Sequence, residues 1–290
     1  MKTTRVLSLI VAVAMMTLGA AACSGSDDNA AGSSSTSVST TASTTAPPEK
    51  LTILVSNDDG FSAPGIDALV QAVVALPDTE VVVAAPATQQ SGKGSTVTDG
   101  DLTVTDEKTM SGYPAHAVAG TPADSVNWAL NGGIDVKPDL VLTGINQGQN
   151  LGEIGNRVSG TLGAARAAVA HGIPALASSM GIQATGDRDT ADYALAATYV
   201  VEWVKEHRAD ILDGKLAGDS PLLENMNIPS CNSGGELRGV VEVTMAGTAE
   251  GALSADQNCK STMPAAPDDI TSFNNGFVTV SEATALPPAA

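Results

Sequence analysis

Two adjacent carboxylates on a tight turn are the first residues in the chain that could do chemistry. Asp58 and Asp59 follow a short apolar run, and Gly60 after them permits a tight turn. Neighbouring carboxylates bind divalent cations through their oxygen atoms, and a carboxylate can accept a proton during hydrolysis. An isolated turn of this kind can equally serve to cap the helix that follows. The turn alone therefore leaves both roles open.

Two later loops, residues 89–96 and 144–152, are polar and rich in glycine. Each follows a predicted strand, and ligands of open α/β sheets bind outside the carboxyl ends of the strands. The first loop, taken alone, also fits an ordinary solvent-exposed connection. Two carboxylates combined with a hydroxyl and an amide oxygen form a hard ligand set, which suits Mg²⁺ or Mn²⁺ better than zinc or copper.

The histidines and cysteines do not form a zinc pattern. His116, His171 and His207 are the only histidines, and no two of them have the spacing of a ligand pair. The cysteines lie far in the sequence from the polar loops. We interpret the histidines as structural or surface residues.

A third polar segment, Ser159-Gly160-Thr161, stands at the predicted start of an alanine-rich helix. The unpaired N–H groups and the dipole of a helix N-terminus favour an anion, so the segment can hold a phosphate group. Simple capping of the helix by serine or threonine explains the same residues. Both interpretations remain open at this point.

The elements that would position these loops alternate between strand and helix. Short apolar runs indicate strands, and apolar residues at helical spacing indicate helices. Such alternation predicts an α/β fold with a doubly wound, mostly parallel sheet. The strands are expected at residues 51–56, 80–85, 102–105, 115–119, 140–143 and 174–178, and the helices at 64–76, 122–130, 161–171 and 191–207. Strand-like runs at 237–245 and 277–280 suggest a C-terminal β excursion.

Composition limits the class of partner. The 290 residues, 43% of them hydrophobic, are enough for one main domain. The net charge of −18 argues against nucleic acid as a partner, because a phosphate backbone is bound by a basic surface. Solubility alone explains most acidic surfaces, although the carboxylates also favour divalent cations.

The N-terminus has the pattern of an export signal. Lys2 and Arg5 precede an uncharged apolar stretch, and small residues end it before Cys23. We predict a signal peptide over residues 1–22, although a retained membrane anchor is the alternative. The position of Cys23 resembles a bacterial lipobox, whose cysteine carries the lipid. Residues 23–50, rich in Ser, Thr and Ala, are expected to be a disordered tether to a domain over residues 51–290.

The other two cysteines have two possible states. Lipidation of Cys23 would leave Cys231 and Cys259 as the remaining thiols of the chain. In an oxidising compartment these two can form a disulfide, provided that the fold brings them close together. Two unpaired thiols are the alternative.

Taken together, these motifs resemble the SurE family of survival-protein nucleotidases over nearly all of residues 51–283. The resemblance is specific because the motifs occur in order along the chain. They are residues 53–60 with 63–66, 83–86 with 91–92, 120–125, 144–146 with 148 and 150–152, 159–161, 225–229 and 276–280.

The resemblance implies a Rossmann-like fold and hydrolysis of nucleoside 5′-monophosphates, with 3′-monophosphates as further substrates. It also implies a homodimer or homotetramer. One divalent ion, Mg²⁺ or Mn²⁺, would be held by Asp58, Asp59, Ser91 and Asn146, and the two aspartates would be the catalytic residues. The residues expected to contact the phosphate are Gly60, Asn150, Ser159, Gly160 and Thr161.

Two other functions fit the same sequence. A lipoprotein that binds a small ligand without turnover would also have a signal, a tether and an α/β domain. A phosphatase of other small phosphate esters or of polyphosphate would use the same ligand set. We expect an exported protein, at the cell surface or in the periplasm, whose only membrane contact is a lipid on Cys23.

Overall fold

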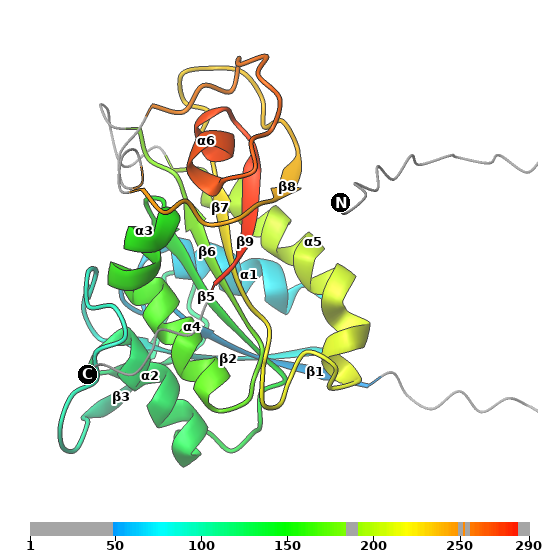
Figure 1. The fold of residues 1–290 in the computed structure, drawn as a ribbon. Coiled ribbons are helices and arrows are strands. Elements are labelled where there is room, and N and C mark those ends of the chain that lie inside the picture. The colour runs from blue at the N-terminus through cyan, green and yellow to red at the C-terminus, as the bar shows by residue number, and fades with distance from the viewer. Residues whose placement is uncertain (1–48, 184–190, 249–251, 253–255, 284–290) are drawn as a thin grey trace, which may run out of the picture. The chain divides into compact units, whose positions relative to one another are not determined.

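The computed structural model describes residues 49–183, 191–248, 252 and 256–283. These residues belong to one compact unit (Figure 1). The predicted signal peptide, Cys23 and the predicted tether up to residue 48 lie outside the described residues. No helix in the described ranges is both long and apolar enough to cross a membrane.

A nine-stranded sheet in the order β3-β4-β2-β1-β5-β6-β7-β9-β8 forms the centre of this unit. The strands from β2 to β7 in this order are parallel to one another, and β3 and β9 run antiparallel to β4 and β7. The predicted α/β class with a mostly parallel sheet is therefore confirmed. The strands are β1 (Leu51–Ser56), β2 (Thr79–Pro86), β3 (Val104–Lys108), β4 (Pro114–Val118), β5 (Leu140–Gln147), β6 (Ala175–Met180), β7 (Leu223–Ile228), β8 (Val240–Glu242) and β9 (Val278–Glu282).

Helices cover both faces of the sheet. On one face α1 (Pro64–Val74) packs beside α5 (Tyr193–Leu212), and on the other α2 (Pro122–Trp128) packs beside α4 (Gly160–Ala170) (Figure 1). Two short helices, α3 (Gly152–Val158) and α6 (Asp269–Asn274), and the π-helical turn η1 (Ala129–Gly133) complete the described elements.

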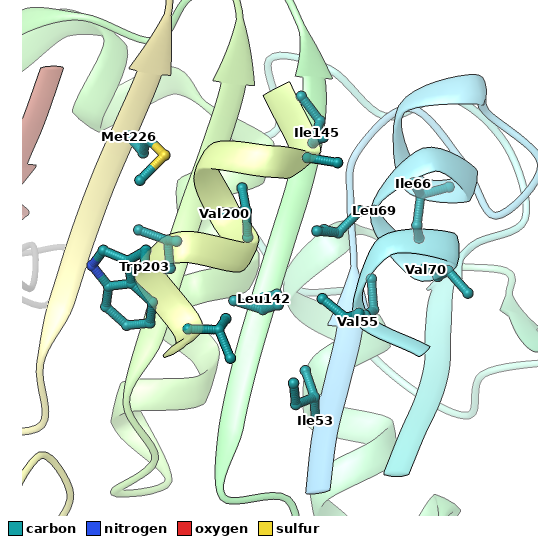
Figure 2. Close-up of a cluster of buried hydrophobic side chains, with 14 of the residues drawn as sticks. Ile53, Val55, Ile66, Leu69, Val70, Leu142, Ile145, Val200, Trp203 and Met226 are labelled. Atoms are coloured by element: carbon teal, nitrogen blue, oxygen red, sulfur yellow. The ribbon is translucent and has the colours of Figure 1, made fainter. Parts of the chain in front are cut away.

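The core follows from the alternation of side chains along β1. Ile53 and Val55 point into the cluster formed with α1 and α5, whereas Leu54 between them packs against α2 and α4. Figure 2 shows the first cluster, in which Leu69 and Val200 of the two helices lie over the strands. Because both of their faces are buried, β1 and β2 carry apolar residues at most positions.

Chain order creates a switch point at the middle of the sheet. From β1 the chain moves to β2 on one side, and it later returns to β5 on the other side. Loops that leave neighbouring strands in opposite directions open a crevice at the carboxyl ends of those strands. The switch point here lies at the carboxyl ends of β1 and β5.

The predicted end of β5 at residue 143 is wrong, because the strand continues to Gln147. Its pairing with β6 shifts register between Thr143 and Asn146, so a local irregularity interrupts the apolar pattern without ending the strand. Gly144 makes this possible. It has a φ of 122°, and a Cβ at this position would lie 2.2 Å from the Ser178 carbonyl oxygen.

The C-terminal third differs most from the sequence-based expectation. The sequence pattern predicts no strand over β7 and a nine-residue run near β8, but β8 has only three residues, Val240–Glu242. β7 carries two buried asparagines, which weaken its apolar signal. Together β7, β9 and β8 continue the main sheet to its edge, and α6 lies between β8 and β9 in the chain.

A disulfide joins Cys231 and Cys259, whose Cα atoms are 5.4 Å apart. Beside it, the buried Gln257 side chain accepts hydrogen bonds from the backbone N–H of Ser230 at 2.5 Å and from its hydroxyl at 3.0 Å. The Gln257 amide also donates to the carbonyl oxygen of Ile182 at 2.9 Å. The disulfide therefore closes a segment whose side chains hold the loops that follow β6 and β7.

The double variant Cys231→Ala/Cys259→Ala is expected to unfold more easily than the wild type. The disulfide spans 28 residues, and closing a loop of this length stabilises a fold by about 3 kcal/mol, chiefly by restricting the unfolded chain. Urea unfolding of both proteins, with and without a reductant, measures the difference. Reductant should lower the free energy of unfolding of the wild type to that of the variant and leave the variant unchanged. An equal effect of reductant on both proteins would contradict the expectation.

Candidate active site

The switch point brings the carboxylate turn after β1 and the glycine-rich loop at the end of β5 together. Ser56, the last residue of β1, pairs with Thr143 of β5, so the segment from Asn57 onward leaves the sheet beside the end of β5. The Asp59 carboxylate accepts a hydrogen bond from the Gln147 backbone N–H at 3.1 Å. Asp59 therefore lies directly against the end of β5, next to Asn146.

Asn57 holds the turn that carries the two carboxylates. Its side-chain amide donates to the Gly60 carbonyl oxygen at 2.9 Å, and its side-chain oxygen accepts from the Gly60 N–H at 3.2 Å. Gly60 has a φ of 102°, which a residue with a side chain rarely adopts. The geometry explains why a glycine follows Asp59.

The Asp58 carboxylate lies at the N-terminus of α4. It is 3% exposed and accepts a hydrogen bond from the Thr161 hydroxyl at 2.7 Å, and the Thr161 backbone N–H also donates to it. A Cβ on Gly160 would lie 2.8 Å from the Asp58 Cβ, so only glycine permits this approach. The segment Ser159-Gly160-Thr161 therefore lies against Asp58.

Ser159 caps the same helix. Its hydroxyl accepts a hydrogen bond from the Leu162 N–H at 3.1 Å, as the capping interpretation requires. At the start of α4, Thr161 thus binds the Asp58 carboxylate, whereas the Ser159 side chain caps the helix itself. An anion that approached this turn would also be next to Asp58.

The loop after β2 reaches the site by its backbone. The Gln90 N–H donates to the Asp58 carbonyl oxygen at 2.7 Å, and the Gly94 N–H donates to the Val158 carbonyl oxygen at 3.1 Å. Ser91 itself is exposed, and the side chain of Gln89 hydrogen-bonds both Ser91 and Asp59. Ser91 is therefore connected to Asp59 through Gln89, a residue that the sequence analysis does not assign to the site.

Asn146 is almost fully buried at the end of β5. Its side-chain N–H donates to the Gly148 carbonyl oxygen at 2.6 Å. This bond fixes the amide so that its oxygen is the atom that remains for a cation.

Asn150 connects the β5–α3 loop to the start of α4. Its side-chain N–H groups donate to the Ser179 hydroxyl at 3.0 Å and to the Thr161 hydroxyl at 3.4 Å. Asn225 and Asn227 of β7 hold its backbone, and sequence reasoning does not assign them to the site. Two asparagines on one face of a buried strand are the signal that could have identified them.

Burial sets the electrostatics of the two aspartates. Burial, followed by the charge of Asp59, raises the pKa of Asp58 from 3.8 to about 7, although hydrogen bonds from Thr161 oppose the rise. Burial also raises the pKa of Asp59, against hydrogen bonds from the Gln147 N–H and from Gln89. Among the described residues, no lysine, arginine or histidine forms an ion pair with either carboxylate.

The donor set fits a hard divalent cation. It offers carboxylate, amide and hydroxyl oxygens, and the negative charge has only neutral hydrogen-bond donors around it. Within the described ranges, no three side chains of the types His, Cys, Asp and Glu gather into a possible metal cluster. Among the described residues, the candidate metal ligands here are therefore Asp58 and Asp59 together with neutral oxygens.

Comparison with known proteins shows which family the chain resembles. The family model described as "Survival protein SurE" matches residues 53–252. A 5′-nucleotidase SurE of Methanothermobacter thermautotrophicus is 39% identical over 195 residues, which cover 65% of this chain and 71% of that protein. A 5′-nucleotidase SurE of Methanocella arvoryzae is 38% identical over 184 residues, which cover 61% of this chain and 66% of that protein.

A solved structure extends the similarity to the fold. The crystal structure of Sure protein from Aquifex aeolicus superposes with a TM-score of 0.60 and 28% sequence identity, covering 79% of this chain and 92% of that one. The matched family model spans well over half of the chain and includes the carboxylate turn, both glycine-rich loops and the start of α4. The chain therefore belongs to the SurE family.

Proposed function

We propose that this protein is a divalent-metal-dependent phosphohydrolase that cleaves nucleoside 5′-monophosphates, and also 3′-monophosphates, to nucleoside and phosphate. The observation that supports this function best is the pair Asp58 and Asp59, which lies at the switch point of the sheet with no cationic partner among the described residues. The names of both curated relatives, 5′-nucleotidase SurE, support the substrate class.

The metal site that we propose consists of Asp58, Asp59, Ser91 and Asn146, with Mg²⁺ or Mn²⁺ as the ion. Three of these residues lie at the ends of adjacent strands, and Ser91 is linked to Asp59 through Gln89. When bound, a divalent ion polarises a phosphate oxygen and makes a water molecule easier to deprotonate.

The two carboxylates supply the proton acceptor. A carboxylate whose pKa lies near 7, as burial gives Asp58, is ionised in part of the molecules at neutral pH and can take a proton from water. The Thr161 hydroxyl holds the Oδ1 atom of Asp58, and the Gln147 N–H holds the Oδ2 atom of Asp59. Both groups are thus oriented before a substrate arrives.

Donors on the opposite side of the proposed metal would hold the phosphate. The first turn of α4 favours an anion, and Gly160 lets this turn lie close against Asp58 because it has no Cβ. The Asn150 side chain adds N–H donors beside Thr161. We propose that Gly60, Asn150, Ser159, Gly160 and Thr161 form this phosphate-binding part of the site.

We further propose that the protein is exported and held at the membrane by a lipid on Cys23, as a homodimer or homotetramer. The sequence pattern before Cys23 supports export, and the disulfide between Cys231 and Cys259 fits an oxidising compartment.

Purified protein is expected to release phosphate from AMP in the presence of Mg²⁺ or Mn²⁺, and EDTA should abolish the release. Asp58→Asn and Asp59→Asn should each lower kcat by at least about 100-fold, because each removes a charged oxygen ligand and a possible proton acceptor. Phosphate release from a panel of 5′- and 3′-monophosphates, sugar phosphates and polyphosphate also ranks the substrates.

Asp67→Asn is the matched control for this assay. Asp67 lies in the first turn of α1, and its carboxylate accepts hydrogen bonds from the backbone and hydroxyl of Ser111, away from the site. This variant should keep wild-type turnover. Nucleotide binding without phosphate release would instead favour a binding protein, and unchanged turnover in both site variants would refute the site.

The pKa of Asp58 predicts an unusual pH dependence of stability. Its folded pKa of about 7 lies above its ordinary value of 3.8, so ionisation costs more in the folded than in the unfolded state. The cost is absent below about pH 4, grows as the pH rises to about 7, and is constant above that. In EDTA, Asp58→Asn should therefore unfold a few degrees higher than wild type near pH 7.5, with no gain near pH 4.

Asp124→Asn gives the opposite control. Burial raises the pKa of Asp124, but hydrogen bonds from Thr98 and Thr121 outweigh it and lower the pKa overall. Its ionised form therefore stabilises the fold above its ordinary pKa, and the variant should unfold lower than wild type at neutral pH. Thermal unfolding of the wild type and both variants across pH measures these differences. A lower unfolding midpoint for Asp58→Asn than for the wild type at neutral pH would contradict the expected free-energy cost of ionising Asp58.

Lipid attachment is tested on the full-length chain expressed in a bacterium. Labelling with a palmitate analogue should appear in the wild type and disappear in Cys23→Ser, because the lipid is attached to this cysteine. In detergent-free fractionation, the wild type should then be found with the membrane and the Cys23→Ser variant in the soluble fraction. Equal labelling of the two proteins would remove the lipoprotein proposal.

A further inference from the structure

Two asparagines on β7 are buried although their strand is two positions away from β5 in the sheet. Asn225 and Asn227 are both 0% exposed, and their spacing puts them on the same face. Asn227 is aligned with Ser179 of the intervening strand β6. The polar face of β7 thus extends toward the β5–α3 loop.

The two side chains hydrogen-bond to the backbone of a single residue, Asn150. Asn227 accepts a hydrogen bond from the Asn150 N–H at 2.7 Å and donates to its carbonyl oxygen at 3.2 Å. Asn225 donates to the same carbonyl oxygen at 2.7 Å. Both polar backbone groups of Asn150 are therefore satisfied by side chains of β7.

From Asn150 the hydrogen bonds continue to the carboxylate pair. Its side chain donates to the Thr161 hydroxyl at 3.4 Å, and that hydroxyl donates to the Asp58 carboxylate at 2.7 Å. With the backbone of Asn150 fixed, only two side-chain torsions remain to aim its amide at the start of α4. The clamp on β7 thereby determines where the Asn150 donors lie.

The two asparagines make no other hydrogen bond with their side chains in the described part of the chain. All three bonds go to the backbone of Asn150. The two side chains therefore serve this one loop residue rather than the strand that carries them.

We infer that Asn227 and Asn225 are positioning residues that hold Asn150, and through its side chain the Thr161 hydroxyl beside Asp58, in the phosphate-binding part of the site. The inference rests on the proposed function, because it concerns the phosphate-binding part of the same site. Asn227 makes two hydrogen bonds to Asn150 and Asn225 makes one, so Asn227 contributes more to the position of Asn150.

The test compares Asn227→Leu and Asn225→Leu with the wild-type full-length protein. Turnover of AMP with Mg²⁺ gives kcat and KM, and calorimetry with inorganic phosphate in the presence of Mg²⁺ gives a dissociation constant that needs no turnover. Loss of a residue that orients a ligand-binding group lowers activity by about 10- to 100-fold. Asn227→Leu should show this loss in kcat/KM with weaker phosphate binding, and Asn225→Leu a smaller loss of both.

A double-mutant cycle with Asn150→Ala separates positioning from a general effect on folding. Once the Asn150 amide is absent, Asn227→Leu should lower kcat/KM by less than about 2-fold further, because the two changes remove the same contact. A purely structural role predicts instead that the two losses multiply. It also predicts that activity follows thermal stability across the variants, whereas a positioning role predicts that Asn227→Leu loses more activity than a variant that loses as much stability elsewhere in the fold.

Ser272→Ala is the matched control, because its buried hydroxyl also holds both backbone groups of one residue. It accepts from the Ala266 N–H at 2.8 Å and donates to the Ala266 carbonyl oxygen at 2.9 Å, in the α6 region. This variant should lose stability but keep its kcat/KM and its phosphate affinity.

The outcomes distinguish this inference from the proposed function. A wild type that binds phosphate and hydrolyses AMP, with Asn227→Leu unchanged in both, overturns the inference alone. A wild type that binds phosphate without hydrolysis overturns the hydrolase, and the phosphate affinities of the variants still decide the positioning role. A wild type that neither binds phosphate nor hydrolyses any nucleotide overturns both.

Discussion

The site depends on one electrostatic constraint, the placement of two consecutive carboxylates, one of them only 3% exposed, without a counter-ion among the described residues. Burial and mutual repulsion both act against ionisation of Asp58, and its pKa rises to about 7. The surrounding donors, Thr161, Gln147 and Gln89, are neutral and offset only part of the cost. A site with this surplus of negative charge is unstable by itself, and a divalent cation is the partner that its oxygen atoms fit.

The fold supplies the means to hold that charge. The switch point places the ends of β1 and β5 together, and the backbone of the loop after β2 is tied to the Asp58 carbonyl oxygen. Close packing around α4 depends on residues without a Cβ. A Cβ on Gly163 would lie 1.8 Å from the Gly94 carbonyl oxygen, so the loop that carries Ser91 could not rest on the helix if residue 163 had a side chain. Stability of the core and geometry of the site are thus connected through the same contacts.

Sequence reasoning succeeds where the signal is local and fails where it is not. The bounds of β1 and the start of α2 at Pro122 follow from neighbouring residues, and the structure has both. The continuation of β5 to Gln147 depends on a partner strand that lies 30 residues or so further along the chain, which a local pattern does not contain. The same holds for the site. Its loops are recognisable from their composition, but the Thr161 contact to Asp58 and the clamp of Asn227 on Asn150 join residues 103 and 77 positions apart.

The start of α4 shows how metal and phosphate would depend on each other. Its first-turn donors already face Asp58, because the hydroxyl and backbone N–H of Thr161 both donate to that carboxylate. A phosphate that used the same helix terminus would therefore stand beside two carboxylates, and three neighbouring anionic groups would repel one another. A cation between the carboxylates and the phosphate reverses the sign of each neighbouring interaction. Phosphate affinity at this site must then rise with metal occupancy, and by thermodynamic linkage the phosphate must tighten the metal by the same factor.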